Sequence, residues 1–328
     1  MYVDNLPKGI KLIGGYAFEN CGHVGISVIP SPVMELDSMC LRGCSAMTTV
    51  RFLGKPNLIT PSAFYLDRNV HDVYVPWSSG EVEDAPWGMT NATIHYDCDV
   101  SDYYIQDGLY AWYDGVRNTR NSHDPNATVW ENLGSAGSDK DLTLYPDHCS
   151  VESDHLHLNG TGLAATMGNT TLFGNQFTIE VVYARGTASK GIIIFGYDAN
   201  IGNPIIYTDS SGNVVLEERQ SRKGIASSQG EVTYFAKYRS GNLIKNGEYA
   251  EMSTTEEYFD DLGFSKGMRI GDADTSVLDS CPGNGDIYCI RFYNRVLSDI
   301  EIAHNYNIDR VRFRLYRQES SSSSSSSN

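Results

Sequence analysis

The sequence has little positive charge. Among its 328 residues, 25 are Lys or Arg and 41 are Asp or Glu, so the formal net charge is −16. Nucleic acids and anionic membranes attract proteins through positive surfaces that release counterions. The basic residues near the end of the chain, Arg310 to Arg317, are interpreted as solvated side chains. We therefore expect no nucleic-acid partner.

Long apolar runs are also missing. No stretch approaches the roughly 18 apolar residues that a membrane helix requires, so we expect no membrane insertion. The segment Met1–Pro7 lacks the basic start and apolar core of a secretory signal, which predicts synthesis without a signal peptide. Seven cysteines, an odd number, favour free thiols over a disulfide framework. An extracellular destination stays open, because virion proteins leave cells by lysis.

The common catalytic motifs are not found. The sequence contains no phosphate loop, dinucleotide fingerprint, nucleophile elbow or Cys-x-x-Cys pair. Glycoside hydrolysis uses two carboxylates across the scissile bond, and no strand-like Glu-x-Asp-x-Glu run supplies them. The nearest acidic run, Glu81 to Asp84, lies in a predicted loop. These absences predict a protein that is not an enzyme and has no required cofactor.

Glycine and tyrosine are abundant, with 31 and 21 residues, whereas charged residues make up 20% of the chain. Short aromatic strands joined by glycine turns fit this composition, and the length suggests two domains. The expected fold class is mainly β.

A short repeat runs through the first part of the chain. Residues 17–21, 40–44 and 63–67 carry variants of one pattern, Ala-Phe-x-x-Cys, and the interval from Cys21 to Cys44 recurs from Cys44 to Asp67. This interval lies within the range of leucine-rich repeats, which is about 20–29 residues. The pattern resembles the BspA-like bacterial leucine-rich repeat and implies a short solenoid over residues 1–97, with one strand in each coil.

The repeat also predicts which solenoid residues are buried and which are exposed. Cys21 and Cys44 are expected to pack as small buried residues. Solenoids commonly bind partners through their outward strand face. Here that face would contain Ile26, Val28, Thr49, Arg51, Asp72 and Tyr74.

A polar junction, residues 98–107, separates this region from a series of short predicted strands. The motif Trp130-x-x-Leu133 with Gly137 and Asp139, and the hairpin signal Asn246-Gly247, resemble laminin-G-like (concanavalin A-like) domains of phage tail and bacterial surface proteins. The resemblance implies that residues 108–315 form an antiparallel jelly-roll β-sandwich. Residues 316–328 are expected to be a flexible Ser-rich tail.

The most distinctive stretch is Gly285–Tyr306. Its strand alternation predicts Tyr288, Ile290 and Phe292 on one face. Ser298 and Glu301 then form a capping box that starts a short helix. We expect this strand and helix to close the jelly roll.

Three groups of residues are candidates for binding. Trp112, Tyr197, Tyr207 and Tyr234 could serve as sugar platforms, although core packing is the simpler interpretation. Asp272 and Asp274 are candidate calcium ligands, with ordinary turn chemistry as the alternative. His155 and His157 share one strand face and could hold zinc, but without recognisable further ligands we interpret them as facing water.

Together these observations predict a non-enzymatic adhesion protein of phage-tail or bacterial-surface type that recognises surface glycans through its jelly-roll domain. The alternatives are a structural virion decoration or appendage subunit and a divergent glycoside hydrolase. Expected partners are a cell-surface glycan or host receptor and other virion or surface proteins, with homo-oligomer formation left open. The expected location is the virion or the bacterial cell surface.

Overall fold

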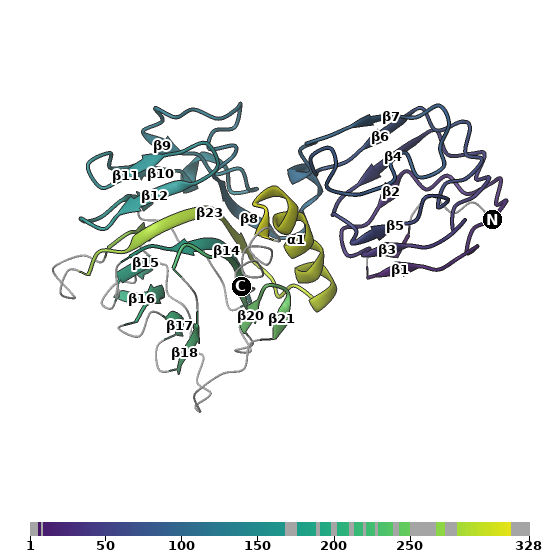
Figure 1. The fold of residues 1–328 in the computed structure, drawn as a ribbon. Coiled ribbons are helices and arrows are strands. Elements are labelled where there is room, and N and C mark those ends of the chain that lie inside the picture. The colour runs from purple at the N-terminus through teal and green to yellow at the C-terminus, as the bar shows by residue number, and fades with distance from the viewer. Residues whose placement is uncertain are drawn as a thin grey trace, which may run out of the picture. The chain divides into compact units, whose positions relative to one another are not determined.

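The computed structural model describes residues 6–7, 9–167, 176–187, 191–197, 202–209, 213–218, 221–226, 229–238, 243–249, 267–272 and 281–315. Over these residues the chain is mainly β, with one α-helix, α1 (Asp299–Arg312) (Figure 1). It divides into two compact units, residues 1–106 with 298–328 and residues 107–297. Within the described ranges, no helix has both the length and the apolar character of a membrane span.

The first unit contains a solenoid with two parallel sheets. One sheet is formed by β1 (Leu12–Ile13), β3 (Glu35–Leu36) and β5 (Leu58–Ile59), and the other by β2 (Val28–Ile29), β4 (Thr49–Phe52), β6 (Asp72–Tyr74) and β7 (Thr93–His95). Leu12 pairs with Glu35, which pairs with Leu58, so the coils step by the predicted interval. The prediction of one strand per coil is wrong, because each of the first coils also contributes a two-residue strand. Such strands are too short to leave a period in the sequence.

Inside the solenoid, residues at equivalent positions of successive repeats stack in columns. Cys44 is buried and Cys21 is partly buried against the same core, in agreement with a packing role. All seven cysteines are free thiols, and burial raises the pKa of Cys44 to about 12. Ile26, expected on the outward strand face, is instead completely buried. The turn before β2 therefore directs this apolar side chain inward, where it loses contact with water.

Helix α1 belongs to the solenoid unit. Ser298 is its N-cap: its hydroxyl accepts a hydrogen bond from the amide of Glu301, whose carboxylate accepts one from the amide of Ser298, as the capping box predicts. The helix was expected to close the jelly roll. Instead, Val311 reaches the solenoid core, and Arg310 donates to the carbonyl of Lys55 at 2.7 Å. The helix therefore covers apolar surface that the coils alone would expose.

The second unit contains two antiparallel sheets. In one sheet the strand order is β11 (Cys149–Val151), β12 (Leu156–Asn159), β23 (Asn284–Tyr293), β14 (Thr178–Arg185), β19 (Val232–Tyr238), β20 (Leu243–Lys245) and β21 (Glu248–Tyr249), and β8 (Leu109–Asp114) also pairs with β23. In the other the order is β18 (Ser221–Ala226), β17 (Asn213–Glu218), β16 (Gly202–Thr208), β15 (Gly191–Tyr197), β22 (Met268–Ile270), β13 (Ala165–Met167), β10 (Leu142–Leu144) and β9 (Val129–Trp130). Side chains of both sheets share one hydrophobic core.

A bulge interrupts the alternation of β23. Ile287 pairs with Tyr183 and Cys289 pairs with Val182, so Tyr288 is an extra residue without an opposite partner on β14. Ile287, Ile290 and Phe292 consequently all reach the shared core. The predicted face shared by Tyr288, Ile290 and Phe292 is therefore wrong. The bulge shifts the alternation by one residue between Ile287 and Ile290 and leaves the side chain of Asp286 on the outward face.

Candidate functional site

The outward face of the β2–β4–β6–β7 sheet carries a stacked row of planar side chains. Arg51, Tyr74 and His95 are paired neighbours on β4, β6 and β7. The guanidinium carbon of Arg51 lies 4.3 Å from the centroid of the Tyr74 ring, and the Tyr74 and His95 rings stack at 4.6 Å between centroids with 14° between planes. We call these three residues the strand-face row. The separation between their side chains follows the separation between neighbouring strands of the sheet.

A carboxylate borders the strand-face row. Asp72, which shares β6 with Tyr74, lies 2.8 Å from Nε2 of His95, and both side chains remain about two-fifths exposed (43% and 40%). Arg51, Asp72 and Tyr74 are thus half-buried residues that alternate with the buried residues of β4 and β6, and their role toward a partner stays a prediction. The repeat does not predict His95 in this row, because the coil that joins β6 to β7 is shorter than the repeat and pairs His95 with Tyr74.

The aromatic residues proposed as sugar platforms lie elsewhere and differ from that expectation. Trp112 is 3% exposed and has the Arg117 guanidinium over its ring, and Tyr234 is fully buried with its hydroxyl donating to Glu180 at 2.5 Å. Both rings are buried and present no platform to solvent, so the platform assignment is corrected for them. Tyr207 packs, partly buried, against Ile192. The side chain of Tyr197 lies outside the described residues.

The candidate calcium ligands are only partly described. Asp272 is buried, and its carboxylate accepts a hydrogen bond from the amide of Cys281 at 2.9 Å. This contact is ordinary turn chemistry, the alternative to a calcium ligand at this position. Asp274 lies outside the described residues, so calcium binding there stays a prediction.

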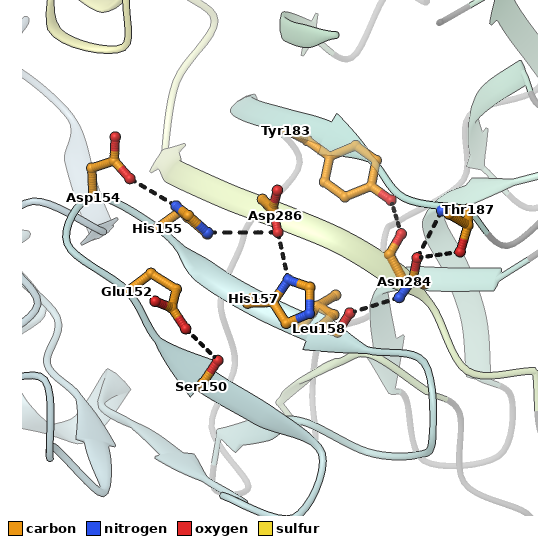
Figure 2. Close-up of polar contacts among 10 residues, drawn as sticks. All are labelled: Ser150, Glu152, Asp154, His155, His157, Leu158, Tyr183, Thr187, Asn284 and Asp286. Carbon is orange, nitrogen blue, oxygen red and sulfur yellow. Dashed lines mark hydrogen bonds and ion pairs between the residues drawn. The ribbon is translucent and has the colours of Figure 1, made fainter. Parts of the chain in front are cut away.

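A second polar cluster lies on the outward face of β12 and β23. His155 and His157 alternate with buried Leu156 and Leu158, as predicted, and they meet Asp286 of β23 (Figure 2). Oδ1 of Asp286 lies 2.6 Å from Nδ1 of His157 and 3.6 Å from Nε2 of His155. We call these three residues the His–Asp cluster. The interpretation that the two histidines face water does not account for the carboxylate of Asp286, which both histidines approach.

The surroundings of the His–Asp cluster are acidic. Nδ1 of His155 lies 2.7 Å from Asp154, and its ring lies 5.0 Å from that of Tyr288. Burial lowers the pKa of His155, but the hydrogen bond to Asp154 and the charge of Asp286 outweigh burial and raise this pKa above its ordinary value. A positive charge is therefore favoured at this point on the surface.

Comparisons with known proteins identify the first region. Residues 4–89 match, in six copies, the model of the BspA type leucine-rich repeat region. The predicted resemblance of the N-terminal repeats is thereby confirmed. Repeats of this type are typical of bacterial surface proteins, which suggests an extracellular location. Among curated proteins, none matches the sequence significantly.

Solved structures resemble the chain at low identity. A Trypanosoma rangeli sialidase in complex with sialic acid has a TM-score of 0.44 and 14% identity, covering 62% of this chain and 33% of its own. The ligand-binding domain of botulinum neurotoxin serotype D, in complex with N-acetylneuraminic acid, has a TM-score of 0.41 and 10% identity, covering 62% and 51%. This chain thus spans about a third of the length of that sialidase. At such scores no residue or activity is transferred.

These comparisons correct the expected function. The similar structures are sialidases and a toxin's ligand-binding domain, which contradicts the prediction of a non-enzymatic phage or cell-surface adhesin. The laminin-G-like assignment of the second unit gains no support from these structures.

Proposed function

We propose that the chain is a carbohydrate-recognising protein whose N-terminal solenoid contacts the glycan through the strand-face row and Asp72. The observation that carries this proposal is the stacked arrangement of Arg51, Tyr74 and His95 beside a half-exposed carboxylate. The proposal moves recognition from the second unit, where Trp112 and Tyr234 are buried, to the repeats.

The chemistry of the strand-face row suits a sugar. Stacking holds the three planar groups in fixed positions, so ordering them on binding costs little conformational entropy. Their exposed edges offer guanidinium N–H donors, a phenol hydroxyl and an imidazole, and Asp72 adds an acceptor. Sugar hydroxyls need this mixture of donors and acceptors. The guanidinium of Arg51 also favours glycans that carry a carboxylate, since Arg binds carboxylates in a planar, paired geometry.

Binding, and not hydrolysis, is the activity that we propose for this surface. Most retaining and inverting glycosidases use two carboxylates facing across the scissile bond, although sialidases use a tyrosine nucleophile. Asp72 is the one carboxylate in contact with the strand-face row among the described residues, and it is paired with His95. The function that we propose for this surface is therefore binding.

For the second unit, we propose the laminin-G-like jelly roll that its sequence resembles. Two antiparallel sheets with a common core support this proposal. The unit is not assigned a ligand through its aromatic residues.

The test is a glycan array probed with the full chain and two variants. Tyr74→Ala removes the centre of the strand-face row, whereas Glu35→Ala changes a residue of β3 on the other solenoid sheet and is the matched control. The proposal predicts binding by the wild-type chain and by Glu35→Ala, and at least tenfold weaker binding by Tyr74→Ala. Absence of binding by folded wild-type protein, or equal binding by Tyr74→Ala, would contradict it.

A further inference from the structure

We propose that the His–Asp cluster is a binding site for a divalent transition-metal ion, with Zn²⁺ as the ion that its donors fit best. His157 and Asp286 are direct partners across β12 and β23. His155 stands two residues before His157, in the bend that leads into β12, and the imidazoles of both histidines meet Asp286. Pairing of β12 with β23 thus brings together three side chains that can bind a metal ion, although they come from distant parts of the sequence.

The distances fit a metal ion. The ligating atoms of the three residues all lie within 4.8 Å of one another. Zinc bonds of 2.0–2.1 Å in a tetrahedron place two ligand atoms about 3.3 Å apart. The observed 2.6 Å and 3.6 Å from Asp286 to the two histidines fall on either side of that value. Small side-chain rotations are therefore enough to surround an ion.

One of the two histidines already has the orientation of a metal ligand. Asp154 accepts a hydrogen bond at Nδ1 of His155, which leaves Nε2 directed toward Asp286 (Figure 2). Metal-binding histidines commonly have their second ring nitrogen held by a carboxylate in this way, which fixes the tautomer and strengthens the ligand. Asp154 therefore holds His155 as a carboxylate beside a metal ligand would. An ion pair between His155 and Asp286 alone would not need this second carboxylate.

Close backbone packing holds the cluster in place. A Cβ at Gly115 would lie 2.2 Å from the carbonyl oxygen of Asp154, so only glycine permits this approach to the backbone before His155. Gly285, next to Asp286, has φ of +140° and a Cβ there would lie 2.3 Å from the carbonyl oxygen of Ala184. Both glycines reduce the movement available to the ligands.

The donor set selects the ion. Two imidazoles and one carboxylate suit zinc and related transition metals, whereas calcium and magnesium prefer oxygen ligands throughout. Three protein ligands leave the fourth tetrahedral position open, as in zinc sites that bind water or a further ligand. The side chain of His157 is 43% exposed, so this position is accessible from solvent.

Calorimetric titration of the metal-free full chain with ZnCl₂ tests the proposal. We expect one ion per chain and a rise in melting temperature, because an ion that binds only the folded state stabilises it. His157→Asn and Asp286→Asn should each weaken binding by more than tenfold. Asp154→Asn should weaken it 10- to 100-fold, since loss of a supporting carboxylate has effects of about that size.

His148→Asn is the matched control, because His148 precedes β11 of the same sheet and bonds Thr161 and not the cluster. It should bind zinc as the wild type does. Absence of zinc binding by the folded wild-type chain would overturn the proposal, and so would undiminished binding by His157→Asn or Asp286→Asn. Near-ultraviolet circular dichroism of each variant establishes that the fold is retained.

Discussion

Asp67 occupies, in the third coil, the position that Cys44 holds in the coil before it. The two are one repeat apart in the sequence, and both are buried. Burial raises the pKa of Asp67 to about 7 from an ordinary value of 3.8, and the charge of Asp67 adds to the burial that raises the pKa of Cys44. An ionisable group thus replaces a small neutral one inside a stacked column.

This substitution predicts a pH-dependent stability. The folded chain retains the Asp67 proton to a higher pH than the unfolded chain, so the free energy of unfolding falls as pH rises from about 4 to about 7. Asp67→Cys restores the repeat residue and removes this loss. Its melting temperature should exceed that of the wild type by more at pH 8 than at pH 4.5. An equal difference at both pH values would show that Asp67 is not protonated in the folded chain.

The capping box predicts a modest local effect. Ser298→Ala removes the side chain that accepts from the amide of Glu301, and loss of such a cap costs about 1 kcal/mol. Thermal unfolding of the full chain should register this cost, while Ser298→Asp, which also caps well, should melt close to the wild type. A wild-type melting temperature for Ser298→Ala would mean that the cap does not stabilise α1 against the solenoid.

The buried ion pair of the second unit predicts a large effect. Nε of Arg291 lies 2.6 Å from Oε2 of Glu180, with side-chain exposures of 1% and 0%. Glu180→Leu leaves the guanidinium charge buried without its carboxylate, and breaking such a pair costs about 3–5 kcal/mol. The double variant Glu180→Leu with Arg291→Leu should be more stable than this single variant in urea unfolding. A double variant less stable than the single one would contradict this explanation.

The sequence predicts features whose determinants are close together in the chain. The repeat interval and the Ser298–Glu301 cap depend on spacing within one repeat or one turn, and both are confirmed. The Asp286 partner of His157 could not be predicted, because strand pairing across 129 residues brings it there. The prediction that Tyr288 shares a face with Ile290 and Phe292 is wrong for a related reason. A bulge depends on the partner strand, which leaves no trace in the alternation of a single strand.

On the outward face of the solenoid, the repeat predicts the positions of some residues but not the contacts between them. Arg51 and Tyr74 were expected there because the repeat fixes their phase, whereas Ile26, which is in phase with Asp72, turns inward. The stacking of His95 on Tyr74 depends on a shorter final coil, which the period does not predict. Position on a face is therefore readable from a repeat, but the contacts that make a site are not.

Hydrogen exchange of the full chain, with and without a glycan selected on the array, tests the central claim most directly. Ligand on the strand-face row should slow exchange of the backbone amides in β4, β6 and β7, because contact there excludes water and suppresses local opening. Binding accompanied by protection confined to residues 107–297 would contradict recognition by the solenoid. Protection over residues 49–52, 72–74 and 93–95, lost in Tyr74→Ala, is the result that this account predicts.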